Sequence, residues 1–313
     1  MLPASLPRIV VGTAHMGRAL PDAFVGRADR ERAFAFLDAL FEMGCTSFDL
    51  AASYMLGGTE RLFGAWMASR GHRDRLYLVS KGGHPHPIFG RHRLGRRALW
   101  ADLEGSLRRL RVDRLDLYLL HKDDVSEPLE SILETMTVCL RQGKIAAWGV
   151  SNWTDDRVRA MSELAGRTGA AGLSASSPHD SLVRWTRPPW PGSVSIAGDE
   201  GASGRAYHEE TQLPVLAWSP LGGGFFGAGM RAGPYASTAN LARRVRAEVL
   251  GARLGASAAQ VALAYLFHQP FPVFAVTASR SAAHMKQSMD AVTIRLSRDE
   301  VLWLESGDGD PPA

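Results

Sequence analysis

The sequence predicts an α/β protein, a (β/α)8 barrel (TIM barrel) that spans residues 1–313 as a single domain with long loops after some strands. Apolar runs of strand length alternate with segments of helical periodicity, and this alternation is typical of a parallel sheet. Eight such runs occur, which is the number of strands that closes this barrel. The open, doubly wound sheet is the competing fold, but residues 12–17 read GTAHMG after the first run and lack its glycine-rich phosphate motif.

The predicted strands are bounded by turn residues, and the segments between them have apolar residues at helical spacing. Strands are expected at residues 8–13, 47–50, 76–80, 115–120, 146–150, 172–175, 214–218 and 272–276. Helices are expected at residues 31–43, 59–70, 97–110, 131–142, 155–165 and 239–254. Segments 82–96 and 186–212 follow strands and are too long for simple turns, so we expect them to be active-site loops.

Composition and charge exclude several classes of protein. With 45% hydrophobic and 22% charged residues, the chain can bury a large core and is unlike a disordered or fibrous sequence. The net charge of +4 comes mostly from scattered arginines, and the basic run at residues 91–97 lacks the interleaved aromatics of a base-stacking surface. We therefore expect a small anionic ligand rather than a nucleic acid.

The cysteines and the N-terminal residues indicate the compartment. Cys45 and Cys139 match no metal-ligand spacing, so we expect buried free thiols, no metal site and a reducing environment. The first residues lack the basic and apolar regions of a signal peptide, and no apolar run approaches membrane-spanning length. We expect a cytoplasmic protein without a membrane partner. The oligomeric state is left open, and a homo-oligomer is one of the states that the sequence allows.

Polar side chains follow three consecutive predicted strands. Asp49 ends the second strand and Tyr54 follows in the same loop, Lys81 ends the third strand, and His121 ends the fourth. Each of them alone also fits an ordinary structural role, such as a helix cap or a solvated charge. Because the strand exits of a barrel converge on one face, a carboxylate, a phenol, an ammonium and an imidazole there form an acid–base set.

These residue types fit the reduction of a carbonyl group. A hydride adds to an aldehyde or ketone only if the growing negative charge on oxygen is stabilised and then protonated. We expect Tyr54 to donate this proton, Lys81 to lower the pKa of the phenol, and Asp49 to hold Lys81 charged and oriented. A neutral His121 would donate a hydrogen bond to the substrate oxygen.

Seven short motifs occur in an order that resembles the aldo-keto reductase superfamily over essentially the whole chain. They are FDLA at 48–51 followed by Tyr54, GTE at 58–60 with LFG at 62–64, LLH at 119–121, GKI at 143–145, GVSN at 149–152 and WSPL at 218–221. The resemblance implies an NADP-dependent oxidoreductase with a barrel fold. It also implies that Asp49, Tyr54, Lys81 and His121 form the catalytic tetrad.

The resemblance further implies a nicotinamide cofactor, with NADPH favoured over NADH. Ser151 and Asn152 would bind the nicotinamide carboxamide, and Ser219, Leu221 and Gly223 would line the pyrophosphate, although a flexible turn also explains the glycines there. The segment Ser279-Arg280 is similar to the one that meets the ribose phosphate. Gln287 and Ser288 stand where the family often has an acidic residue and an asparagine near the adenine.

Four positions depart from the family pattern. Ser177 and Asp180 stand where a glutamine and a nicotinamide-stacking tyrosine are common. Trp218 replaces the tyrosine that often precedes Ser-Pro-Leu, and it would compensate as a cofactor contact or serve only as core packing. Met55 replaces a glycine that often follows the catalytic tyrosine, which restricts the conformation of that loop.

Substrate contacts are expected from residues near the strand exits. They are Met16, Met55, His84 and Trp153, with His86, Phe89 and the stretch 185–190 as further candidates. Aromatic, His and Arg side chains suit a polyhydroxylated or anionic carbonyl compound such as a keto sugar, and core packing explains each one about equally well. Two other functions remain open: a cofactor-binding regulatory subunit of the channel-β type, and keto-sugar dehydration or epimerisation on the same tetrad, with Asp180 as an extra base.

Overall fold

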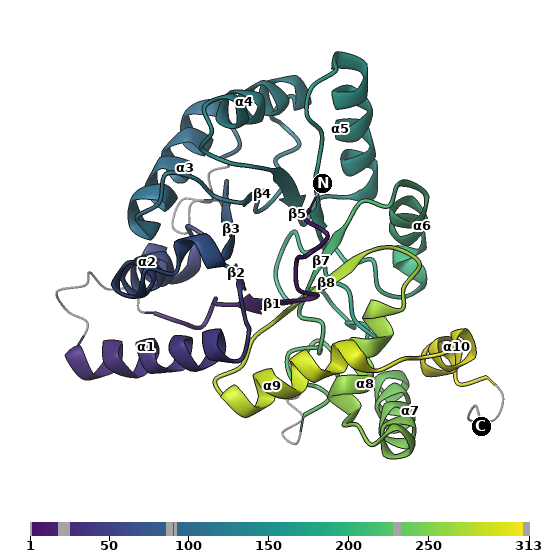
Figure 1. Ribbon diagram of the computed structural model, residues 1–313. Coiled ribbons are helices and arrows are strands. Elements are labelled where there is room, and N and C mark those ends of the chain that lie inside the picture. The colour runs from purple at the N-terminus through teal and green to yellow at the C-terminus, as the bar shows by residue number, and fades with distance from the viewer. Residues whose placement is uncertain (1, 18–25, 86–89, 91–92, 228–232, 309–313) are drawn as a thin grey trace. The chain divides into compact units, whose positions relative to one another are not determined.

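Figure 1 shows the computed structural model of the protein, which describes residues 2–17, 26–85, 90, 93–227 and 233–308. The strands follow one another in sequence order in a closed parallel barrel, so the predicted (β/α)8 fold is confirmed. The strands are β1 (Ile9–Gly12), β2 (Ser47–Asp49), β3 (Tyr77–Gly82), β4 (Leu117–Leu120), β5 (Trp148–Ser151), β6 (Ser176–Ser177), β7 (Val215–Trp218) and β8 (Val273–Thr277).

All six predicted helices are present, with ends that differ from the prediction by up to four residues. They are α1 (Arg27–Glu42), α2 (Gly58–Arg70), α3 (Arg96–Leu110), α4 (Leu129–Arg141), α5 (Asp155–Thr168) and α7 (Thr238–Leu254). The structure adds α6 (Ala202–Thr211), α8 (Ala258–Phe267), α9 (Ala282–Asp290) and α10 (Arg298–Ser306). The prediction that 186–212 is one long loop is therefore wrong at its end, where α6 forms. The predicted loop at 82–96 lies partly outside the described residues.

The sixth strand lies later in the chain than predicted. The apolar run at 172–175 was expected to form it, whereas the strand is Ser176–Ser177, and both serines are buried. The run does contribute hydrogen bonds to the sheet, because the Ser174 amide donates to the Trp148 carbonyl and the Val150 amide donates to the Ala175 carbonyl. The error arises because the strand interior is filled here by small polar residues, so hydrophobicity alone does not mark it.

The chain divides into two compact units, Met1–Ser176 and Ser177–Ala313. In the first unit β1 to β5 pair in parallel with their neighbours in sequence, and helices α2 to α5 alternate with the strands along the chain (Figure 1). In the second unit β7 and β8 pair in parallel. The expectation that residues 1–313 form one domain stays a prediction.

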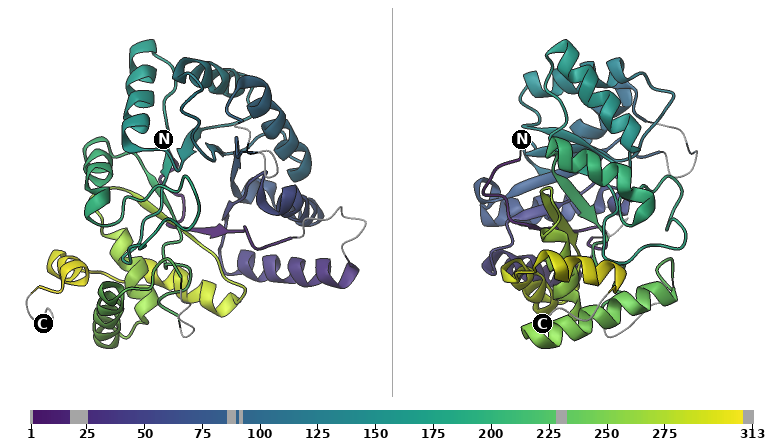
Figure 2. Two further views of the ribbon diagram at one scale, coloured as in Figure 1. Left: turned by 180° about the vertical axis from the view of Figure 1, so that it is seen from behind. Right: turned by 90° about the vertical axis from the view of Figure 1, so that its right-hand side faces the viewer.

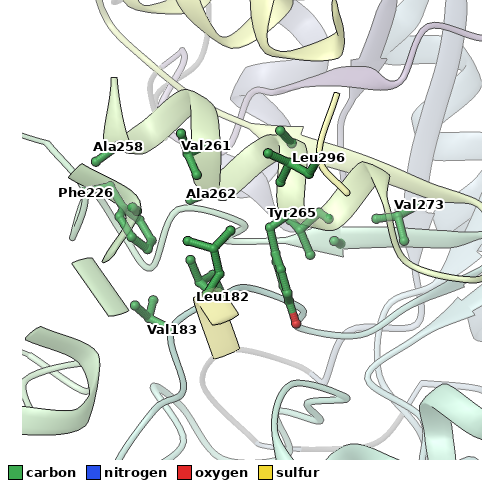
Figure 3. Close-up of a cluster of buried hydrophobic side chains, with 14 of the residues drawn as sticks. Leu182, Val183, Phe226, Ala258, Val261, Ala262, Tyr265, Val273 and Leu296 are labelled. Carbon is green, nitrogen blue, oxygen red and sulfur yellow. The ribbon is translucent and has the colours of Figure 1, made fainter. Parts of the chain in front are cut away.

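The second unit has a hydrophobic core of its own. Figure 3 shows part of it, where residues of α8, such as Val261 and Tyr265, lie near Leu182 and Val183 of the segment after β6. Helices α7 and α8 pack against each other, and both are drawn in green in Figure 2. Their axes are bent by 95° at the junction. Among the described residues no single helix is long and apolar enough to cross a membrane, and only this bent pair passes that test together.

Both cysteines are buried free thiols, as predicted. Cys45 precedes β2, and Cys139 lies in α4, where its side chain is 1% exposed. Burial raises the pKa of each thiol to about 11, because the thiolate loses its hydration. The two thiols are therefore inert at neutral pH.

Candidate active site

The strand register brings the predicted catalytic side chains to one face of the first unit's sheet. Asp49 pairs with Val79, and Lys81 lies two residues beyond Val79. Lys81 pairs with Leu119, and His121 lies two residues beyond Leu119. Since side chains on a strand return to the same face every second residue, Asp49, Lys81 and His121 lie on the same face of the sheet, at the exits of three successive strands. Ser151 continues the series, two residues beyond Gly149, which pairs with Leu119.

Asp49, Lys81 and Tyr54 form a compact, hydrogen-bonded group. The Lys81 Nζ lies 2.7 Å from both carboxylate oxygens of Asp49 and donates to the Tyr54 hydroxyl at 3.0 Å. It also donates to the Leu50 carbonyl at 3.0 Å, and the Tyr54 hydroxyl lies 3.4 Å from Asp49 Oδ2. Asp49 and Lys81 are each about 4% exposed, so the ion pair is fixed by partners on three sides and shielded from water.

Burial sets the charge states within this group. The pKa of Lys81 is raised: burial opposes its charge, but Asp49 and the Tyr54 oxygen outweigh that effect, so the ammonium form persists. The pKa of Tyr54 is also raised, first by burial and then by Asp49. Lys81 lowers the Tyr54 pKa, as expected, but burial raises this pKa by more, so the net shift is upward. Tyr54 is therefore a protonated phenol at neutral pH.

His121 lies against the Tyr54 ring and is a neutral imidazole. The two ring centroids are 5.7 Å apart in an edge-on arrangement. Burial, followed by the charges of Lys81, His84 and Lys122, holds the pKa of His121 well below its usual range. The Ser53 hydroxyl lies 3.3 Å from His121 Nδ1, and the His84 ring lies edge-on at 5.1 Å. The neutral state expected from the sequence agrees with these surroundings.

The turn after Tyr54 has an unusual backbone. Tyr54 opens the short 3-10 helix η2 (Tyr54–Gly57), in which Met55, Leu56 and Gly57 all have left-handed φ angles of 49°, 51° and 78°. An added Cβ on Gly57 would lie 2.7 Å from Arg109 Cδ, so another residue there would have to displace the Arg109 side chain and adopt a left-handed φ. The sequence predicts that Met55 restricts the conformation of this loop, and in the structure the loop is a turn of left-handed residues.

A buried glutamate connects this turn to the strand that carries Lys81. Glu60, in the first turn of α2, is fully buried and accepts hydrogen bonds from Ser80 Oγ at 2.6 Å and from Arg109 Nε at 2.7 Å. Ser80 precedes Lys81 in β3. Glu60 therefore ties the start of α2, the end of α3 and β3 together beneath the tetrad.

Ser151 and Asn152, the expected carboxamide contacts, lie at the exit of β5 and are buried. Asn152 has a left-handed φ of 56°, and its Nδ2 donates to Ser151 Oγ at 3.1 Å and to the His121 carbonyl at 3.4 Å. These bonds fix the amide beside the strand exits of the first unit.

In the second unit, the segment after β7 forms a turn rich in left-handed residues. Ser219, Gly222, Gly223 and Gly224 all have positive φ, and the Ser219 hydroxyl bonds to Tyr235. The Gly222 and Gly224 amides donate to Ser219 and Leu221 within the turn. Among the described residues the Gly223 amide has no hydrogen-bond partner, and Gly224 faces open space, with no atom within 4 Å of an added Cβ. A backbone of this kind fits a pyrophosphate group.

The expected adenosine contacts lie around the start of α9. Ser279 Oγ accepts the Ser281 amide at 3.0 Å, and Ser281 caps the helix N-terminus by accepting the His284 amide. Arg280 and Gln287 are exposed, whereas Ser288 is buried and donates to the His284 carbonyl. An exposed arginine beside a helix N-terminus suits a phosphate group.

The positions that depart from the family pattern have their own partners. Ser177 is buried and donates to the Leu216 carbonyl at 2.8 Å. Trp218 stacks on Trp190 with centroids 4.9 Å apart and lies edge-on to His179. Asp180 is buried, and burial raises its pKa to about 7.

The remaining predicted substrate residues differ in exposure. Met16 is half-buried, and its carbonyl accepts a hydrogen bond from Thr59 at 2.7 Å, while Met55 is 37% exposed. Trp153 is 1% exposed, with the Arg157 guanidinium 5.3 Å from its ring centroid. His86 and Phe89 lie outside the described residues. No cluster of three metal-ligating side chains occurs in the part of the chain that the structure describes.

Two residues near the tetrad were not singled out from the sequence. Ser53 contacts His121, and Glu60 supports the strand of Lys81. Ser53 directly precedes Tyr54, so its place in the same loop was the available signal. Glu60 belongs to the GTE motif at 58–60, but its supporting role could not be predicted, because a charged residue near a helix start ordinarily stays in solvent.

Comparisons with known proteins identify the family of the chain. A family model described as the Aldo/keto reductase family matches residues 8–306. Methylglyoxal reductase YeaE of Escherichia coli is 32% identical, over 96% of this chain and 90% of its own length. Norsolorinic acid reductase stcV of Emericella nidulans is 28% identical, over 95% of this chain and 77% of its own length.

Solved structures show the same fold. The thermostable aldo-keto reductase Tm1743, in complex with the inhibitor epalrestat, has a TM-score of 0.75 and 25% identity, covering 96% of this chain and 95% of its own. An aldo/keto reductase from Klebsiella pneumoniae, in complex with NADP and acetate, has a TM-score of 0.73 and 28% identity, covering 98% of this chain and 93% of its own.

The chain therefore forms a (β/α)8 barrel that carries a buried Asp–Lys–Tyr group at its strand exits. With a family match over nearly its whole length, this chain belongs to the Aldo/keto reductase family and is an enzyme.

Proposed function

We propose that the protein reduces the carbonyl group of an aldehyde or ketone with NADPH, using Tyr54 as the proton donor. The observation that carries this proposal is the Tyr54 hydroxyl, which accepts a hydrogen bond from the Lys81 ammonium at 3.0 Å within a buried group. NADPH, when bound, supplies the hydride to the carbonyl carbon. The roles of the protein are then to orient the carbonyl, to stabilise negative charge on its oxygen and to deliver a proton.

The proton is transferred from the Tyr54 hydroxyl to the substrate oxygen. Because the Tyr54 pKa is raised, the phenol holds its proton until the alkoxide, a much stronger base, develops. The Lys81 ammonium, 3.0 Å away, then stabilises the phenolate that remains, and Asp49 keeps Lys81 charged and in place. The neutral His121 donates from Nε2 to the substrate oxygen if Nδ1 accepts the Ser53 hydroxyl proton.

The cofactor part of the proposal assigns residues in both units. Ser151 and Asn152 would bind the carboxamide, and Ser177 and Trp218 would lie at the nicotinamide. Ser219, Leu221 and Gly223 would bind the pyrophosphate, and the Gly223 amide, which has no hydrogen-bond partner among the described residues, supports this assignment. Ser279 and Arg280 would bind the ribose phosphate, with Gln287 and Ser288 near the adenine; the exposed Arg280 favours NADPH over NADH. The NADP and NADPH complexes of the Klebsiella pneumoniae enzymes are consistent with this choice.

A cytoplasmic location belongs to the same proposal, because two free thiols persist in a reducing compartment. The substrate would be a small-molecule carbonyl compound, with Met16, Met55, His84 and Trp153 as the proposed contacts. The relatives include proteins named methylglyoxal reductase and norsolorinic acid reductase.

The test combines cofactor binding with turnover. NADPH and NADH are titrated by fluorescence, and NADPH oxidation is then followed with a panel of carbonyl compounds for the wild type and for Tyr54→Phe. We expect NADPH to bind more tightly than NADH. We also expect Tyr54→Phe to lower kcat by about 100-fold or more while NADPH binding is kept, because only the proton donor is removed.

Other outcomes would reject the proposal in distinguishable ways. Tight NADPH binding without turnover of any carbonyl would contradict the reductase function and favour a regulatory role. An absence of nicotinamide binding would reject the cofactor assignment. Turnover that Tyr54→Phe leaves intact would reject Tyr54 as the donor.

A further inference from the structure

The residues that follow Tyr54 adopt a backbone conformation that their side chains disfavour. Met55 (φ 49°, ψ 38°) and Leu56 (φ 51°, ψ 44°) both lie in the left-handed helical region, and Gly57 follows with φ 78°. For residues with a Cβ this region brings the side chain too close to the backbone, and it is ordinarily occupied by single glycines or asparagines. Two adjacent apolar residues in it are unusual.

The fold explains the path of this turn but not its residue types. The Leu56 amide donates to the Ser53 carbonyl at 3.2 Å, and Arg61 donates to the Leu56 carbonyl at 3.3 Å. Both bonds use backbone atoms of Leu56, so glycine or asparagine would make them with less strain. The conformation therefore gives no reason for methionine and leucine.

Burial within the protein gives no reason either. Leu56 is 62% exposed and Met55 is 37% exposed, so neither side chain is held in a core. In the first unit, large apolar side chains of the strands and helices are mostly buried, as with Phe48 and Phe63. Leu56 thus combines a disfavoured backbone with an apolar side chain left in water.

The turn is held in place at both ends. Tyr54 is bonded to Lys81 and Asp49, and Gly57 packs against the Arg109 side chain so closely that a Cβ would not fit. Arg109 is in turn bonded to the buried Glu60. Two apolar side chains are therefore presented in a fixed position, one and two residues from the proposed proton donor.

We propose that Met55 and Leu56 form an apolar wall of the substrate site and determine its specificity. This proposal rests on the carbonyl reductase function proposed above. Thioether and isobutyl groups offer no strong hydrogen bond, so they favour carbonyl compounds that carry an aryl or long alkyl group over small polar ones. A bound apolar group would cover the exposed surface and offset the unfavourable backbone.

The test replaces the side chains without adding backbone strain. Met55→Asn and Leu56→Asn are suitable, because asparagine tolerates the left-handed region and is polar. The quantity measured is the ratio of kcat/KM for 2-naphthaldehyde to kcat/KM for methylglyoxal, with NADPH. We expect each variant to lower this ratio by about tenfold, mainly through a higher KM for 2-naphthaldehyde. The melting temperature should stay within ~2 °C of the wild type or rise.

Arg111→Asn is the matched control. Arg111 is an exposed, non-glycine residue with φ 60° at the end of α3, so this variant changes the same kind of backbone position outside the proposed site. We expect it to leave the ratio at the wild-type value. A ratio that also falls in Arg111→Asn would assign the effect to general changes in stability and overturn the proposal.

A ratio that stays at the wild-type value in both turn variants would overturn the proposal even though the reductase function stands. If the wild type oxidises no NADPH with any carbonyl, the reductase function fails first, and quenching of tryptophan fluorescence by 2-naphthaldehyde still tests the wall. Binding about tenfold weaker in Leu56→Asn than in the wild type and Arg111→Asn would support it. Equal binding in all three proteins would overturn it.

Discussion

At the scale of single residues, the hydroxyl of Ser53 affects the proposed site through its contact with His121. It lies 3.3 Å from Nδ1 of His121, whose pKa is lowered, so the imidazole is neutral and carries one proton on one of two nitrogens. If Ser53 donates to Nδ1, the proton of the ring is on Nε2, where the proposed mechanism requires it. Ser53 is then a positioning residue that selects the tautomer of His121.

Replacing Ser53 tests this selection. We expect Ser53→Ala to lower kcat for carbonyl reduction by about tenfold with little change in KM, because a fraction of His121 then holds the wrong tautomer. Ser53→Thr, which keeps a hydroxyl, should retain most of the activity. Steady-state kinetics of both variants is the measurement, and a Ser53→Ala enzyme as fast as the wild type would contradict the role.

The residue scale also shows what the sequence could and could not predict about the site. Asp49, Lys81 and His121 could be brought together because each ends a predicted strand, and strand exits of a barrel converge. The upward shift of the Tyr54 pKa could not be predicted. The sequence contains the cation that lowers this pKa, but it does not show how deeply the phenol is buried, and burial raises the pKa by more. The burial of Trp153, whose side chain is 1% exposed, could not be predicted from the sequence either.

At the scale of secondary-structure elements, hydrophobic periodicity found seven of the eight strands in place and six helices. Two of the elements that were not predicted, β6 and α6, have a physical cause in their composition. β6 consists of two buried serines, and the hydroxyl of Ser177 donates to the Leu216 carbonyl. Helix α6 has the sequence ASGRAYHEET, which is mostly polar and small, so its helical spacing is weak.

The Glu60–Arg109 pair joins elements and should matter for stability. Glu60 is fully buried and bonded to Arg109 and Ser80, so removing either partner of the ion pair leaves an uncompensated charge. We expect Arg109→Ala to lower the free energy of unfolding by about 3 kcal/mol, because the buried Glu60 carboxylate loses its cation. Glu60→Gln should cost less, since the amide oxygen still accepts from Ser80.

Chemical denaturation of the single variants and of Glu60→Gln combined with Arg109→Ala measures this coupling. The double variant should lose less than the sum of the two single losses, because neither removal leaves a charge once both are gone. Losses that add without a coupling term would show that the pair contributes no more than an exposed ion pair does.

At the scale of the whole molecule, Asp180 makes stability depend on pH. Its carboxyl is 1% exposed, Oδ2 has no hydrogen-bond partner among the described residues, and burial raises its pKa to about 7, although Arg205 opposes the shift. An unfolded aspartate has a pKa of about 3.9. Between about pH 4 and pH 7 the folded protein therefore binds a proton that the unfolded chain has released, and folding stability from this group falls as the pH rises through that window.

Asp180→Asn removes this dependence while nearly keeping the shape of the side chain. At pH 8 the wild type must bury an ionised carboxylate or bind a proton from dilute solution, whereas the variant does neither. We expect the wild type to lose on the order of 3 kcal/mol more stability than Asp180→Asn between pH 4 and pH 8. Thermal unfolding of both proteins at the two pH values is the measurement. Parallel stability curves would mean that Asp180 is ionised in the folded protein and that Arg205, with its positive charge, compensates for burial.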